Sequence, residues 1–257
     1  MKRLYILILA LPLLAGCLAD YSDVNVINAA SLEKYAMQTM IQNVILPVEA
    51  LELAIDFDEY LKKTDEEKEK DVFFYGNISK EQENEYVIKI DFSKFSDEYR
   101  TIYCILNTKG CSLTDVGAEW EYKNFNMYGN DFSLSNLDYS FSLPQDSKLT
   151  VMAEEESTWA VTFDEHTACR MKMKSKNDSL YEWLIEAQGK ETTTREISAD
   201  FGTSGNFTIK ERSIKANVKE NIYSGKFNVN IYKDGEPYDY CYLTFTPGEM
   251  MKSQTSR

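Results

Sequence analysis

The stretch KFNVNIYKDGEPYDYCYLTFT, residues 226–246, is the part of the sequence that most clearly indicates a fold class. Apolar and polar side chains alternate over residues 227–231, and a period of two is typical of a strand with one buried face. Asp234-Gly235 follows, a pair that readily adopts the left-handed conformations of a two-residue hairpin turn. A second strand-like run covers residues 238–246. The stretch therefore predicts two antiparallel strands joined by a tight turn.

The same alternation recurs along most of the chain after residue 72. Turn-forming residues separate the runs, among them Tyr75-Gly76-Asn77 and Tyr128-Gly129-Asn130. We interpret these two tripeptides as turns and not as a repeat, because their flanks differ. About a dozen strands at this spacing predict a mainly β domain, built as a sandwich, a barrel or a curled antiparallel sheet. The clearest runs are residues 86–92, 159–164, 169–174 and 181–187.

Residues 31–61 carry a helical pattern instead. Their apolar side chains recur at spacings of three and four, which places them on one stripe of a helix. Ser31 is a suitable N-cap, and Pro47 should kink or split the helix because it lacks a backbone donor. We expect an N-terminal amphipathic helix packed on the sheet. The stripe consists of Met37, Ile41, Val44, Ile45, Val48, Leu51 and Ile55.

Composition excludes several classes of function. The 257 residues include 42 acidic and 28 basic side chains, for a net charge of −14, and one histidine. Nucleic-acid binding requires clustered Lys and Arg, so we expect no nucleic-acid partner. A single histidine excludes a poly-His metal site, and we expect no metal or cofactor. No alternation of strands and helices is present, which argues against a dinucleotide-binding fold.

The N-terminal sequence MKRLYILILALPLLAGC, residues 1–17, has the pattern of an export signal. Two basic residues precede the apolar segment 4–14, which is too short to span a membrane. Leu14-Ala15-Gly16-Cys17 resembles the lipobox of bacterial lipoproteins. The resemblance implies cleavage before Cys17, a diacylglycerol on its sulfur and acylation of its new amino group. Several acyl chains would anchor the protein stably in a membrane.

Other features near the anchor bear on location. Leu18, and not Asp, follows the lipobox, which in lipoproteins of the Gram-negative pattern implies the outer membrane. Asp20 and Asp23 resemble the acidic residues that Bacteroidetes-type lipoproteins use for surface display. Asp178-Ser179-Leu180 resembles the O-glycosylation acceptor of that group, with Ser179 as the modified residue, or is a plain turn. We expect a lipid-anchored protein at the outer membrane, on the periplasmic side or the cell surface.

The expected organisation has four parts. Residues 1–16 form the signal peptide and residues 17–30 a lipidated tether. Residues 31–246 form a single helix-plus-antiparallel-β domain, because no linker rich in Pro, Gly or Ser divides its strands. Two packed β subdomains are the alternative. Residues 247–257 form a C-terminal tail.

Four cysteines remain beside the lipobox: Cys104, Cys111, Cys169 and Cys241. An even number in an exported protein favours at least one disulfide, although the sequence alone allows three pairings. Cys104 and Cys111 flank a turn-like segment and are the candidate pair. Cysteines in strand-like runs also serve as small hydrophobes.

No catalytic constellation stands out in the sequence. His166 lacks the G-x-S-x-G context of a serine hydrolase. Glu119 and Glu121 share one face of a strand, but such a pair is common in an acidic chain and does not indicate a glycosidase. We therefore expect no catalytic residues, with an undetected hydrolase as the third alternative.

Aromatic residues are the most suggestive feature. The three tryptophans, Trp120, Trp159 and Trp183, lie in strand-like runs. Three interpretations are open for them: packing in a core, stacking on sugar rings, or lining an apolar cavity. We expect a cell-envelope lipoprotein with a non-enzymatic binding or structural role that recognises a glycan or a protein. The alternative is a lipocalin-like carrier of an apolar small molecule. Tyrosines that could decorate exposed faces are Tyr86, Tyr99, Tyr103, Tyr122, Tyr139, Tyr223, Tyr238, Tyr240 and Tyr242.

Overall fold

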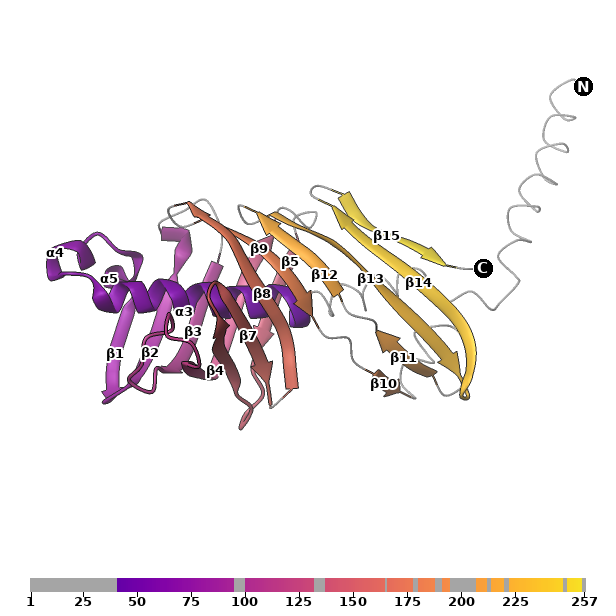
Figure 1. The fold of residues 1–257 in the computed structure, drawn as a ribbon, viewed down its shortest axis with the longest axis horizontal. Helices are drawn as coiled ribbons and strands as arrows, with labels where there is room; N and C mark the ends of the chain where they lie inside the picture. Colours follow the sequence, from indigo (N-terminus) through magenta and orange to yellow (C-terminus); the bar gives the residue numbers. More distant parts are fainter. Residues whose placement is uncertain are drawn as a thin grey trace, which may run out of the picture.

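The structure is a computed structural model, and it describes residues 41–94, 100–131, 137–164, 166–177, 180–187, 191–194, 207–211, 214–219, 222–246 and 249–255. These residues form a mainly β protein, with a helix packed against a large antiparallel sheet (Figure 1). This confirms the predicted fold class. Residues 1–16, Cys17 and Ser179 lie outside the described residues.

The described strands belong to one sheet with the order β1-β2-β3-β4-β6-β7-β8-β9-β12-β13-β11-β10, while β5 pairs with β4, and β14 pairs with β13 and β15. Each pairing is antiparallel. The strands are β1 (Asn77–Gln82), β2 (Glu85–Asp91), β3 (Arg100–Asn107), β4 (Glu119–Asp131), β5 (Leu137–Ser142), β6 (Leu149–Glu155), β7 (Thr158–Phe163), β8 (His166–Asn177), β9 (Leu180–Ala187), β10 (Glu191–Thr194), β11 (Phe207–Glu211), β12 (Ile214–Lys219), β13 (Ile222–Lys233), β14 (Glu236–Thr246) and β15 (Glu249–Thr255).

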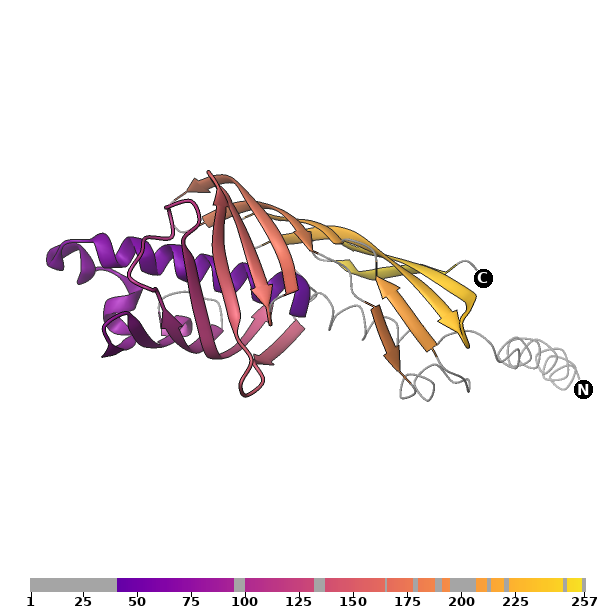
Figure 2. The same ribbon diagram turned by 60° about the horizontal axis from the view of Figure 1, so that its bottom comes forward.

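Of the three architectures predicted, the described strands form the curled sheet. Figures 1 and 2 both show β1 to β9 curving around the long helix α3 (Leu46–Lys62), while β12 to β15 extend beyond the N-terminal end of that helix. Residues 249–255, which we expected in a tail, pair with β14 as strand β15. The remaining short helical segments are η1 (Ile41–Ile45), α4 (Asp65–Lys68), α5 (Val72–Tyr75) and η2 (Phe92–Lys94).

The opening hairpin has the predicted turn. β13 and β14 pair along their length, with Lys233 opposite Glu236. Asp234 and Gly235 both have positive φ, 52° and 89°, as a turn of this type requires. The Asp-Gly pair therefore determines where this chain reverses.

Pro47 lies where the helical segment changes type. It is in the first turn of α3, directly after the π-helical turn η1 (Ile41–Ile45). The helix therefore changes its winding at this point, and α3 is not interrupted within its length. Residues 31–40 of the predicted helix lie outside the described residues.

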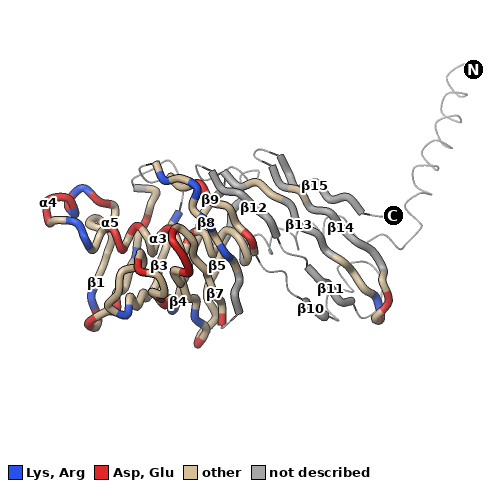
Figure 3. Tube along the Cα trace, in the orientation of Figure 1, with Lys and Arg blue, Asp and Glu red and all other residues tan. Residues whose placement is uncertain are grey.

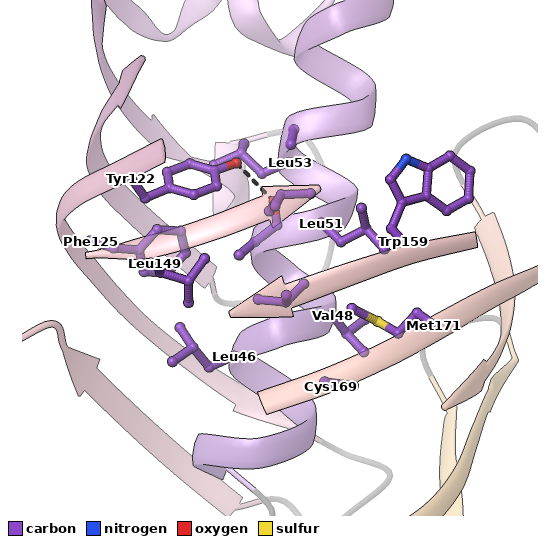
Figure 4. Close-up of a cluster of buried hydrophobic side chains, with 14 of the residues drawn as sticks. Leu46, Val48, Leu51, Leu53, Tyr122, Phe125, Leu149, Trp159, Cys169 and Met171 are labelled. Atoms are coloured by element: carbon purple, nitrogen blue, oxygen red, sulfur yellow. Dashed lines mark hydrogen bonds between the residues drawn. The ribbon is translucent and has the colours of Figure 1, made fainter. Parts of the chain in front are cut away.

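The concave side of the sheet is filled by α3. From Leu46 to Leu51 every helix residue is buried, so this part of the helix contacts protein around its whole circumference. Figure 4 shows its leucines and Val48 against Tyr122, Phe125 and Met171 of the strands, and the Tyr122 hydroxyl donates a 2.8 Å hydrogen bond to the carbonyl of Ala50. The helix thus occupies the space in which a lipocalin-like carrier would hold its cargo. None of the described helices is both long and apolar enough to cross a membrane.

Candidate functional site

The three tryptophans belong to the core. Trp120 and Trp183 are fully buried and Trp159 is nearly so. Each indole donates a hydrogen bond inside the protein: Trp120 and Trp159 to backbone carbonyls of the loop before β4, and Trp183 to a carboxylate of α3. Of the three interpretations left open for these tryptophans, their burial favours packing in the core over contact with an external ligand. They fill the space between helix and sheet instead.

The candidate disulfide is absent. Cys104, Cys111 and Cys169 are free thiols. The register pairs Asn107 with Glu121, so Cys111 lies in the long loop between β3 and β4 and not opposite Cys104. Burial raises the pKa of the Cys104 and Cys169 thiols, which favours their uncharged form and a role as small core hydrophobes. The Cys241 side chain is outside the described residues.

The paired carboxylates that we considered for glycosidase chemistry are engaged in surface ion pairs. Glu119 pairs with Lys109, and Glu121 lies 3.3 Å from Lys148 and 3.6 Å from Lys123. His166 starts β8, where its backbone pairs with that of Phe163, and its side chain is outside the described residues. Within the described part of the chain, no group of three His, Cys, Asp or Glu is arranged to hold a metal ion.

Four acidic side chains of α3 interact with residues of the sheet, and we call them the acidic row: Glu49, Glu52, Asp56 and Glu59. Figure 3 shows the acidic residues along this helix. The carboxylate of Glu49 lies 2.6 Å from Nη1 of Arg100, and that of Glu52 accepts a 2.7 Å hydrogen bond from the Trp183 indole. These ion pairs and hydrogen bonds hold α3 against the sheet at several points, so the acidic row has a structural role.

Burial changes the ionisation of this row. Desolvation, with a contribution from the charge of nearby Glu49, raises the pKa of Glu52 from 4.5 to about 8. Desolvation also raises the pKa of Asp56, although the hydroxyl of Tyr181 and the ammonium of Lys176 oppose the shift. Glu52 is therefore mainly protonated at neutral pH.

An irregularity in β8 brings Lys176 to this row. The register of β8 on β9 shifts between Met173 and Ser175, after which Lys176 pairs with the buried Tyr181. A one-residue bulge moves the following side chains to the other face of a sheet. Lys176 thus reaches the helix, with its Nζ 3.4 Å from Asp56 and 2.7 Å from Glu59.

The outer face of the sheet carries a groove of about 600 Å³ over β2 to β5 and the junction of α5 with β1. We call it the tyrosine groove, because Tyr75, Tyr103 and Tyr128 line it with 61%, 38% and 41% of their surface exposed. Large exposed aromatics gathered in one hollow differ from single exposed apolar residues, which are common on any protein.

The strand register places the outward-facing lining residues of β2 to β5, Tyr103 and Tyr128 included, in two rows that cross the sheet. In the first row Lys89, Tyr103, Asn126 and Ser142 stand opposite one another on β2 to β5. In the second row Asp91, Thr101, Tyr128 and Ser140 do the same. The residues between the rows point inward and are buried under α3: Ile90, Ile102 and Met127.

Local structure at α5 places the third tyrosine. The Asp71 side chain caps this short helix by accepting a 3.0 Å hydrogen bond from the Phe73 amide. Gly76 ends it, and a Cβ there would lie only 3.0 Å from Cγ1 of Ile90. The glycine therefore lets the chain pass closely over β2, which brings Tyr75 to one end of the groove.

The described lining of the tyrosine groove has the composition of a binding surface. It combines aromatic rings with amides, hydroxyls, the Lys89 ammonium and the Asp91 carboxylate. Such lining, and a volume within the roughly 300–1,000 Å³ of small-molecule sites, suits a ligand with both apolar and hydrogen-bonding faces. A shallower groove of about 430 Å³ lies elsewhere on the outer face, with Lys172, Leu184 and Glu186 in its lining.

Sequence reasoning found only part of this groove. Tyr103 was among the tyrosines expected on exposed faces, whereas Tyr75 and Tyr128 were noted only within supposed turns. Tyr128-Gly129-Asn130 lies inside β4, which corrects the turn prediction. The two similar tripeptides nevertheless contribute to one groove, because the strand register brings them together.

Comparison of the chain with models of protein families, with curated proteins and with solved structures finds no match among any of them.

Proposed function

We propose that this chain is a lipid-anchored cell-envelope protein with a non-enzymatic recognition role, and that the tyrosine groove is its recognition surface. The observation that carries the proposal is the gathering of Tyr75, Tyr103 and Tyr128 in one hollow of the outer face. Tyrosine provides a large, rigid contact area with a polar tip, at a low cost in conformational entropy. The anchor rests on the resemblance of residues 14–17 to a lipobox.

The first testable prediction concerns the proposed lipid anchor on Cys17. In cells given labelled palmitate, the wild-type protein incorporates label and fractionates with membranes, because acyl chains on Cys17 hold it there. The Cys17→Ser variant takes up no label and is recovered in the soluble fraction. The matched control is Cys111→Ser, which changes a half-buried cysteine of the described domain and keeps both properties. A Cys17→Ser protein that stays with the membranes would contradict lipid as the sole anchor.

The second prediction concerns the tyrosine groove as the proposed recognition surface. A photo-crosslinking residue at Ser142, which lies in the groove with its side chain exposed, should form an adduct in intact cells. The additional changes Tyr103→Ala and Tyr128→Ala should lower its yield at least fivefold, because they remove the aromatic contacts. The control places the same residue at Leu184, which is exposed in the other outer groove. Equal yields at both positions, or none at Ser142, would overturn the proposal.

A further inference from the structure

We propose that the ligand of the tyrosine groove is an uncharged oligosaccharide that lies across strands β2 to β5. This inference rests on the proposed recognition role of the groove and adds the chemical class of the ligand. It is carried by three properties of the lining: its aromatic faces, the polar rows between them and the balance of its charges.

The aromatic faces suit a sugar ring. A pyranose presents C–H groups on its faces and hydroxyls around its rim, so it packs against an aromatic ring while its rim forms hydrogen bonds. Tyr103 and Tyr128 project from adjacent strands in adjacent rows, and Tyr75 stands at the α5 end of the groove. The Tyr75 ring also packs edge-on against Phe74, with 5.4 Å between the ring centroids, which supports it at an otherwise exposed site.

The polar rows suit hydroxyl groups. Asn126 and Ser142 continue the row of Tyr103, and Thr101 and Ser140 flank Tyr128. Amides and hydroxyls donate and accept, as sugar hydroxyls do, so the two sets can satisfy one another on either side of the aromatic rings. The amide of Asn126 is held by a 2.8 Å hydrogen bond from its Nδ2 to the carbonyl of Asn124.

The charges of the groove and of the whole chain oppose anionic ligands. Among the described residues, the lining of the groove contains one ammonium, on Lys89, and one carboxylate, on Asp91. A polyanionic glycan would meet a single compensating charge within a chain of net charge −14, and like-charge repulsion would oppose its approach. A neutral ligand needs no compensating charge and is not repelled by the negative charge of the chain.

The extent of the groove indicates more than one sugar ring. From Lys89 on β2 to Ser142 on β5 the first row crosses three strand spacings, which is roughly 14 Å. A single pyranose would cover only part of this row and leave other aromatic faces exposed. A short, linear oligosaccharide would cover it.

The experiment uses the full-length lipoprotein in a detergent without a sugar headgroup, since such a headgroup would compete for the groove. The probes are the neutral trisaccharides maltotriose, cellotriose, mannotriose and N,N′,N″-triacetylchitotriose, with trigalacturonate as the anionic comparison. Binding is measured by saturation-transfer NMR and by titration calorimetry. At least one neutral trisaccharide should bind, and trigalacturonate should bind at least tenfold more weakly than that probe.

Matched variants locate the site. Tyr103→Ala and Tyr128→Ala should each weaken binding at least tenfold, whereas Tyr103→Phe should keep most of it because the ring is retained. Leu184→Ala, in the other outer groove, should leave affinity unchanged. Tyr103 and Tyr128 are exposed, and a thermal melt of each variant verifies that it is folded.

The outcomes separate this inference from the proposed function. If none of the neutral trisaccharides binds while Ser142 still crosslinks to a protein in cells, the groove recognises a protein and the saccharide inference is overturned. If trisaccharide binding survives both alanine variants, the sugar site lies elsewhere and the inference is again overturned. If neither binding nor crosslinking occurs, the recognition role fails as well.

Discussion

Replacing Arg100 with Ala should lower the free energy of unfolding by about 3–5 kcal/mol, the range for removing one partner of a buried ion pair. Nη1 of Arg100 lies 2.6 Å from the carboxylate of Glu49, whose side chain is only 8% exposed. The guanidinium also stacks on the ring of Phe92, 4.1 Å from its centroid. The variant therefore loses packing as well as charge, and equilibrium unfolding in urea measures the loss.

Two controls separate the buried pair from an ordinary ion pair. Combining Arg100→Ala with Glu49→Gln should recover a large part of the lost stability, because the buried carboxylate charge that Arg100 faced is then removed as well. Arg170→Ala breaks a pair with Glu154 in which the arginine side chain is 59% exposed, and it should cost less than about 1 kcal/mol. A cost for Arg100→Ala no larger than that for Arg170→Ala would show that Glu49 is not effectively buried.

Replacing Glu52 with Gln should stabilise the protein increasingly as the pH rises from about 4.5 to 8, and so change the pH dependence of its stability. Burial raises the pKa of Glu52 from 4.5 to about 8, so the folded state holds a proton there that the unfolded state releases. The contribution of Glu52 to the free energy of unfolding is then fully present below about pH 4.5 and is lost as the pH rises toward 8. Asp56, whose pKa is also raised by burial, adds a change of the same sign.

The Glu52→Gln variant keeps a side-chain oxygen for the Trp183 indole, but the new amide cannot ionise. We expect the variant to exceed the wild type by on the order of 3 kcal/mol at pH 9 and to match it near pH 4. Urea unfolding at a series of pH values measures both, and Glu119→Gln, which removes one exposed negative charge, is the control. An advantage of Glu52→Gln that is the same at pH 4 and pH 9 would contradict a raised pKa.

Local pattern explains the parts of the fold that were predictable. Alternation in residues 181–187 requires one face toward a core and one toward solvent, and the structure buries Tyr181, Trp183, Ile185 and Ala187 accordingly. Asp234-Gly235 selects its turn through the backbone conformations that the two residues tolerate. Helix α3 follows from apolar spacing in the same way. The change of helix type beside Pro47 agrees with a proline that divides the helical pattern.

The candidate site was less predictable, because it depends on pairs of residues far apart in the sequence. Tyr103 and Tyr128 form one groove only because β3 pairs with β4 in a particular register. The same register separates Cys104 from Cys111. Tyr75 joins the groove because Gly76 permits close packing on β2.

Side-chain periodicity and turn chemistry act over a few residues, so they were enough to predict a mainly β protein with one long helix. They could not predict that α3 fills the concave side, that the three tryptophans are buried in the core or that an aromatic groove lies on the outer face. Those outcomes depend on sheet curvature and strand register, which result from packing among residues distant in the chain.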